Sequence, residues 1–177
     1  MCIRDRLHLV RRMRPSLPAD CLTRVVHALV ISRLHCCHAL SVGLPLEVTW
    51  KLQLIQNAAA RLGTGSGRRD HITQVLRDLH WLPVRFRAQF KVLVLPFKAL
   101  NGLGPVYLKE RLHPNRPART LRSSSKGLLV VPSLQRAFSV VAPALWNALP
   151  SDVKEINHYL TFRRHLKTAL LREVFNV

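Results

Sequence analysis

The chain has 177 residues, 48% of them hydrophobic, which is enough for one domain with an apolar core and excludes wholesale disorder. Lys and Arg number 28 against 9 Asp and Glu, so the formal net charge is +19. Such an excess repels itself unless a polyanion neutralises it, so we expect an RNA or DNA backbone as partner, with an acidic lipid surface as the weaker alternative. No apolar run approaches the roughly 18 residues that span a bilayer, so we expect no membrane insertion.

Apolar residues in the N-terminal half recur at steps of three and four, which predicts helices over about Ala19–Leu40 and Leu46–Leu62. We expect Gly63–Gly67 to end the second helix, because glycine adopts the left-handed conformation at little cost. Asp70 is predicted as the N-cap of a short helix that follows, through Leu79.

The clearest amphipathic stretch is Val84–Asn101, in which phenylalanine and leucine are spaced by four and three residues. Pro96 is expected to kink this helix, because it removes a backbone donor and crowds the preceding turn. A short helix is predicted within Val106–Leu112, and a last one over about His158–Val174.

The segment from Glu110 to Asp152 contains no acidic residue between its ends. Within it, Gly127–Val131 is predicted as a short strand that pairs with Ala137–Val141, and Pro143–Pro150 surrounds a turn of helix. The predicted fold class is therefore mainly α, with a short β-hairpin in the C-terminal part.

The cysteines do not form a disulfide framework. Cys2, Cys21, Cys36 and Cys37 lack any C-x-x-C spacing, which is typical of reduced thiols in an intracellular protein. The run His35–His38 carries metal-ligating side chains, but four consecutive helical residues point in four directions and cannot form a tetrahedron. We expect no metal and no cofactor.

Catalytic patterns are missing from the sequence. Polymerase and nuclease chemistry holds metal ions between clustered carboxylates, whereas the nine acids here are scattered. There is no phosphate-binding glycine loop and no nucleophile elbow. Asp70 beside His71, and Asp78 near His80, are better interpreted as helix-end residues than as acid–base pairs. We therefore predict no catalytic residue, no enzyme activity and no small-molecule substrate.

Seven blocks together resemble the C-terminal region of LINE-type, non-long-terminal-repeat retrotransposon reverse transcriptases of the jockey/chicken-repeat group. Their order and spacing match that family over about Leu7–Leu171, nearly the whole chain. The blocks are Val25–Leu34, Leu52–Leu62, Asp70–Thr73, Leu79–Arg85, Phe97–Gly102, Leu121–Ser124 and Ala144–Pro150.

The resemblance implies the segment after the polymerase palm, a helical thumb followed by a C-terminal extension. Residues 1–18 would be a tail, whose first residues resemble a translated sequencing adapter. Residues 19–112 would form the thumb-like bundle, 113–126 a basic loop, and 127–177 the extension. The thumb of such RNA-directed DNA polymerases grips the template–primer duplex, while the catalytic aspartates lie in a palm that this chain lacks.

The chain also departs from the family's pattern. His35, Cys36 and His38 replace Asp, Tyr and Asn, Pro96 stands inside a helix that the family keeps intact, and Val131–Phe138 is several residues short. These departures indicate an eroded copy.

The predicted phosphate contacts are cations in three groups: those after the glycine loop, those on the polar side of the Val84–Asn101 helix, and those of the acid-free loop. Sequence readout is not expected from them. Trp81 and Trp146 could stack on bases but are better interpreted as core anchors. The predicted binding residues are Arg68, Arg69, His71, Arg85, Arg87, Lys91, Lys98, Arg116, Arg119, Arg122 and Lys126.

Two other interpretations stay open. In one, the chain is a structural fragment whose apolar faces pack on the upstream polymerase palm, without activity of its own. In the other, it is a basic organellar RNA-binding protein with an Arg-rich leader. The sequence does not fix a location beyond nucleus or cytoplasm for an expressed retrotransposon fragment.

Overall fold

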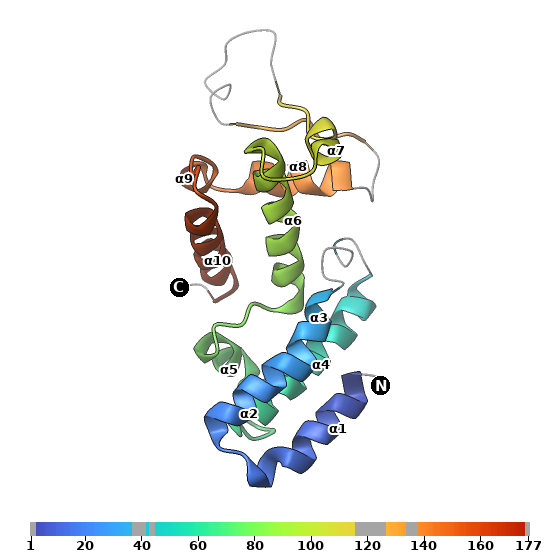
Figure 1. Ribbon diagram of the computed structural model, residues 1–177, viewed down its shortest axis with the longest axis vertical. Helices are drawn as coiled ribbons and strands as arrows, with labels where there is room; N and C mark the ends of the chain where they lie inside the picture. Colours follow the sequence, from blue (N-terminus) through green and yellow to red (C-terminus); the bar gives the residue numbers. More distant parts are fainter. Residues whose placement is uncertain (1–2, 37–41, 43–44, 116–126, 134–137, 176–177) are drawn as a thin grey trace. The chain divides into compact units, whose positions relative to one another are not determined.

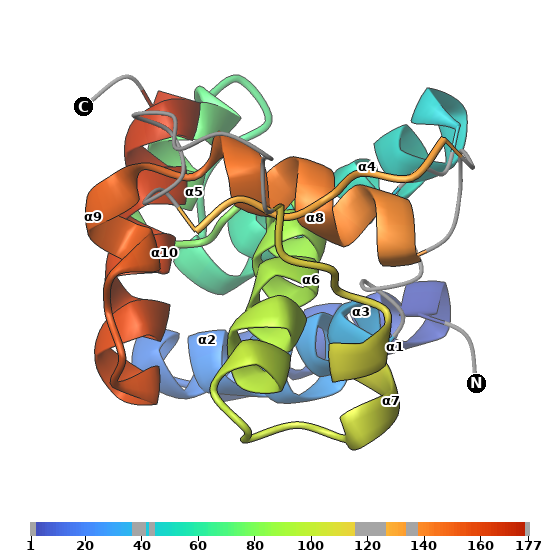
Figure 2. The same ribbon diagram turned by 90° about the horizontal axis from the view of Figure 1, so that it is seen from above.

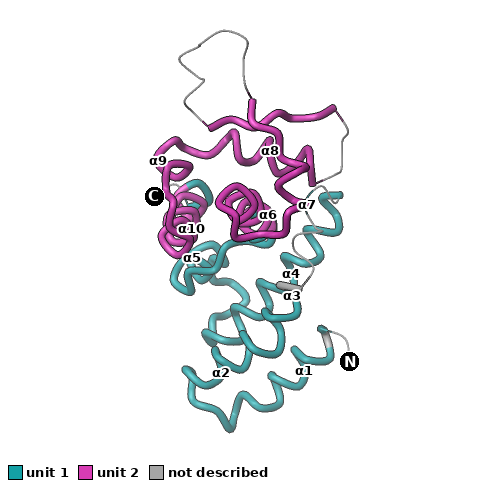
Figure 3. The backbone as a smooth tube through the Cα atoms, turned by 45° about the horizontal axis from the view of Figure 1, so that its top comes forward, with its two compact units in different colours: residues 1–87, 173–177 teal, residues 88–172 magenta. Residues whose placement is uncertain are grey.

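The computed structural model describes residues 3–36, 42, 45–115, 127–133 and 138–175, and these are mainly helical. They form two compact units (Figure 3). Unit 1 comprises residues 1–87 and 173–177, and unit 2 comprises residues 88–172. The division passes through helix α6, so the first residues of that helix belong to unit 1.

Unit 1 is a helical bundle (Figure 1). The predicted helix after Ala19 is confirmed, although its middle, η2, has the wider π-helical winding. Arg6 donates to the Leu29 carbonyl within η2 at 3.2 Å, which satisfies a polar group of the irregular turn. The elements are α1 (Ile3–Met13), η1 (Arg14–Ser16), α2 (Ala19–Val26), η2 (His27–Ile31), α3 (Ser32–Cys36), α4 (Leu46–Thr64) and α5 (Ile72–Asp78).

Five of the described helices begin directly after a proline, among them α6 (Val84–Leu100) after Pro83. Pro18, Pro45, Pro105 and Pro150 each hold an extended backbone conformation at the N-cap of α2, α4, α7 (Val106–Glu110) and α9 (Ser151–Lys154). Proline's fixed φ suits this boundary, and its carbonyl still accepts the first helical hydrogen bond, as in Leu22 N–H to Pro18 O at 2.9 Å.

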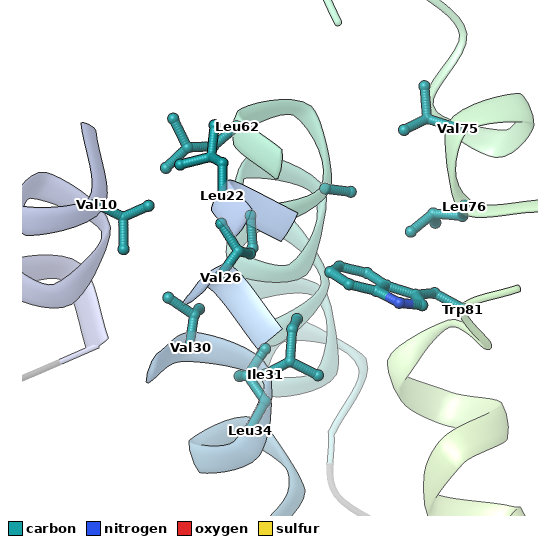
Figure 4. Close-up of a cluster of buried hydrophobic side chains, with 12 residues drawn as sticks. Val10, Leu22, Val26, Val30, Ile31, Leu34, Leu62, Val75, Leu76 and Trp81 are labelled. Carbon is teal, nitrogen blue, oxygen red and sulfur yellow. The ribbon is translucent and has the colours of Figure 1, made fainter. Parts of the chain in front are cut away.

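The core of unit 1 joins α1, the α2–α3 run, α4 and α5. Figure 4 shows side chains of the α2–α3 run, including Val26 and Ile31, in the centre of the cluster. Val10 of α1 approaches from one side, and Leu76 and Trp81 approach from the other. Val10 is fully buried, so the segment that the sequence analysis expected to be a tail supplies part of the core.

A polar link fixes the turn before α6 to the side of α4. Gln53 accepts from the backbone N–H of Val84 at 2.8 Å. Gln56 is buried and donates to the Leu82 carbonyl at 2.9 Å. Because buried backbone groups need partners, these two glutamines determine where the Trp81–Val84 turn lies on α4.

Unit 2 packs its helices around three aromatic rings. Helix α8 crosses the C-terminal end of α6, and α10 lies beside α6 (Figure 2). Phe97 stacks on Phe162 with centroids 4.0 Å apart, and Trp146 lies 6.1 Å from Phe162. All three rings are buried, which confirms Trp146 as a core anchor. The remaining helices are α6 (Val84–Leu100), α8 (Phe138–Ala148) and α10 (Tyr159–Phe175).

The predicted β-hairpin is wrong. Phe138–Val141 belongs to α8, where Ala142 and Trp146 are buried on a helical face, and the described residues contain no strand. Leu129 instead forms a single antiparallel bridge with Pro114. On its other side, the Asn147 side chain accepts from Leu129 N–H and donates to Leu129 C=O, both at 2.8 Å. One amide side chain thus takes the place of a second strand.

A smaller expectation, the N-cap at Asp70, also changes. His71, one residue later than predicted, is the N-cap of α5, and no side chain caps that helix end. Asp70 instead accepts from the Gly67 N–H at 2.6 Å. Pro96, where the sequence predicts a kink, lies buried inside α6, which extends to Leu100.

Candidate nucleic-acid interface

The glycine loop after α4 forms a fixed turn. Gly65 ends the helix with a φ of +74°, as the glycine run predicted. Arg61 of α4 reaches across and donates to the carbonyls of Gly67 and Asp70, the latter at 2.9 Å. Asp70 closes the turn by accepting from Gly67 N–H. The backbone that carries the next two arginines is therefore held from both ends.

Arg68 and Arg69 occupy the tip of this turn, and both side chains are exposed. His71, directly after the turn, is also exposed. The structure thus brings together the first three predicted contacts. Arg14 adds a fourth cation, because its Nη2 would lie 3.4 Å from a β-carbon placed on Gly65. The sequence analysis missed Arg14, since it treated residues 1–18 as a tail.

Arg85 and Arg87 have different environments although they lie two residues apart on α6. Arg85 is exposed. Arg87 turns back on its own unit, where Nε donates to the Leu82 carbonyl at 2.7 Å and the guanidinium lies 5.5 Å from the centre of the Trp81 ring. Burial lowers the pKa of Arg87 to about 10. Arg87 therefore remains cationic at neutral pH but is less available to a phosphate than Arg85.

In unit 2, Lys98 joins a cluster around Tyr159. Its Nζ lies 4.8 Å from the ring centre, and the guanidinium of Arg163 lies 5.5 Å from it. Each cation–π contact orders a long side chain, which lowers the entropy cost of a phosphate contact. Lys91 is half-buried. The predicted row of α6 cations is therefore not a uniform exposed face.

A second group of cations lines a groove of about 560 Å³ between α9 and α10. Arg164, His165 and Arg172 contribute from α10, and Asp152 is the acid on the opposite side. Arg164, Thr168 and Arg172 are spaced by four residues, so they follow one face of the helix. The remaining predicted contacts, Arg116, Arg119, Arg122 and Lys126, fall outside the described residues.

The three tryptophans fall into two classes. Trp81 and Trp146 are buried, at 8% and 4% exposed. Trp50 of α4, which the sequence analysis did not select, is 62% exposed. A signal for it exists in the sequence, because Leu46, Trp50 and Leu54 repeat every four residues, out of phase with the buried stripe of α4.

The comparisons add no assignment. No model of a known protein family, no curated protein and no solved structure matches this chain. Across the described residues, no helix is both long and apolar enough to cross a membrane. Nor do the described residues contain a group of three or more His, Cys, Asp or Glu that could hold a metal ion. The side chains of the His35–His38 run lie outside that description.

Proposed function

We propose that this chain binds the phosphate backbone of RNA or DNA without sequence specificity and performs no catalysis. The observation that supports this most directly is the turn of residues 67–70. Arg68 and Arg69 are exposed on it, and Arg61 and Asp70 hold its backbone. A cation on a fixed backbone loses less conformational freedom when it meets a phosphate than one on a free loop.

The charges around this turn favour an anionic partner. Arg14 lies next to Gly65, and the nearby acid Asp70 already accepts the Gly67 N–H. Guanidinium groups bind phosphate oxygens in bidentate fashion, which favours arginine over lysine at such sites. Contacts of this kind position a protein on a nucleic acid but read no bases, so the proposal includes no sequence preference.

The seven sequence blocks extend the proposal to an origin. We infer a non-catalytic remnant of a retrotransposon reverse transcriptase, in which the thumb-like helices contact a template–primer duplex. The mainly helical fold is compatible with a thumb. An upstream open reading frame encoding a polymerase palm would support this origin, and a flank with no such sequence would count against it.

The test is an anisotropy titration of the full chain with labelled duplexes of unrelated sequence, over a series of salt concentrations. If about six cations meet phosphates, log affinity falls with log salt with a slope of about −4 to −5. Affinities for the different sequences should agree within a few-fold. Binding that ignores salt, or no binding to either RNA or DNA, would contradict the proposal.

A second candidate is a fragment that packs on a polymerase palm. Exposed apolar side chains favour it, among them Leu103, Val106 and Tyr107 at 59%, 71% and 63% exposed. A purified chain that aggregates at low salt, and that ignores nucleic acid, would support this candidate over the first.

A further inference from the structure

An apolar groove opens beside the first turns of α4. It is shallow and open to solvent, with a volume of about 530 Å³, and its exposed lining is almost entirely carbon. Trp50 lies along it at 62% exposed, and Leu46 at 79% exposed. A large aromatic side chain stabilises a protein or a complex most when its apolar surface is buried. The exposure of Trp50 therefore points to an absent occupant. The lining residues are Leu46, Glu47, Thr49, Trp50, Gln53 and Arg85.

Aromatic, basic and acidic side chains lie in or beside the groove. The Trp50 indole offers a flat apolar face. Arg85, exposed at the start of α6, lines the groove mainly with the aliphatic part of its side chain, so its charged end is available to a phosphate beside the apolar surface, and Lys51, outside the lining, is exposed one residue after Trp50. Glu47 is the acid in the lining, and it lies in the first turn of α4, where a negative charge complements the helix dipole. Gln53 is already engaged with Val84 N–H, so it belongs to the wall.

We propose that this groove takes an unpaired nucleobase of the bound RNA or DNA, stacked on Trp50, with the adjoining phosphate held by Arg85. This inference rests on the proposed function. A flat aromatic face next to cations is the combination that single-strand binders use, because every base has a face to stack and every nucleotide a phosphate. The net charge of +19 favours this occupant over an apolar protein surface.

The test compares two substrates of equal duplex length, one blunt and one with a short single-stranded overhang, at fixed salt. The parent chain should bind the overhang substrate more tightly. Trp50→Leu should remove that preference, which corresponds to a loss of about 5- to 150-fold for one stacked base. Affinity for the blunt duplex should stay within about two-fold, and Trp50→Phe should restore part of the preference.

Tyr107→Leu is the matched control, because it removes another exposed aromatic side chain, 63% exposed, in unit 2. It should leave both affinities unchanged. Quenching of tryptophan fluorescence by the overhang provides a second readout, since Trp81 and Trp146 are buried. The overhang should quench the parent but not Trp50→Leu.

The outcomes separate the two proposals. If the parent binds neither substrate, the proposed function fails. If it binds both and Trp50→Leu retains the parent's preference for the overhang, the proposed function stands and the base-stacking site is overturned. If Trp50→Leu instead changes only the sedimentation behaviour of the chain, the groove is a contact between copies, and the stacking site is again overturned.

Discussion

Asn147 offers a direct test of how the C-terminal part is organised. Its side-chain amide makes two hydrogen bonds of 2.8 Å with the backbone of Leu129, a residue that is 3% exposed. The substitution Asn147→Leu keeps the size of the side chain but removes both partners. Each lost bond costs about 1 kcal/mol, and a stranded buried polar group costs about 1–3 kcal/mol. We therefore expect Asn147→Leu to lower the free energy of unfolding by about 2–5 kcal/mol.

Asn147→Asp adds a pH signature. The carboxylate can still accept from Leu129 N–H, but its other oxygen faces the Leu129 carbonyl, so the protonated form is favoured in the folded state. A carboxyl pKa that folding raises binds more protons in the folded state, so stability falls as pH increases through that pKa. The loss of unfolding free energy that Asn147→Asp causes, relative to the parent, should therefore be larger at pH 7 than at pH 4.5.

Urea unfolding followed by circular dichroism measures both effects. Asn157→Asp is the control, because Asn157 is exposed and the same charge change there should alter stability by less than about 0.5 kcal/mol at either pH. If Asn147→Leu and Asn147→Asp are as stable as the parent, the amide does not replace a strand.

Three further outcomes follow from the geometry. Gly65→Ala, at a φ of +74°, should lower the free energy of unfolding by about 1–2 kcal/mol, measured by thermal unfolding. Gly67→Ala, where φ is not positive, should change it little, and equal losses for the two variants would refute the left-handed cap. Arg85→Gln should reduce the salt slope of nucleic-acid binding by about 1, while Arg87→Met leaves it unchanged; the reverse order would contradict the assigned environments. Phe162→Ala should cost about 3–5 kcal/mol, and a loss below 1 kcal/mol would show that its ring is not central to unit 2.

The helices were predictable because their signals are local. Apolar spacing located α4 and α10 within a few residues, and the glycine run located the left-handed end at Gly65. The hairpin prediction was wrong because it relied on local strand propensity alone. Val140 and Val141 favour a strand by propensity, but burial of Ala142 and Trp146 on one helical face outweighs that preference.

The candidate interface was predictable only in part. The turn arginines were found because a glycine loop and adjacent charges are visible in sequence. The engagement of Arg87 with Trp81 and Leu82 depends on how α6 begins relative to the preceding turn, which spacing does not encode. Trp50 was not predicted because α4 carries two apolar stripes, and spacing alone does not say that the stripe of Leu46, Trp50 and Leu54 is the exposed one.

The salt dependence of two double variants tests the central claim that the turn arginines meet phosphates. Arg68→Gln with Arg69→Gln removes two charges from the turn, and Lys109→Gln with Arg111→Gln removes two exposed charges near α7. The account predicts that the first pair lowers the magnitude of the slope of log affinity against log salt by about 2, and that the second pair does not change it. Equal slopes for both variants would contradict the account.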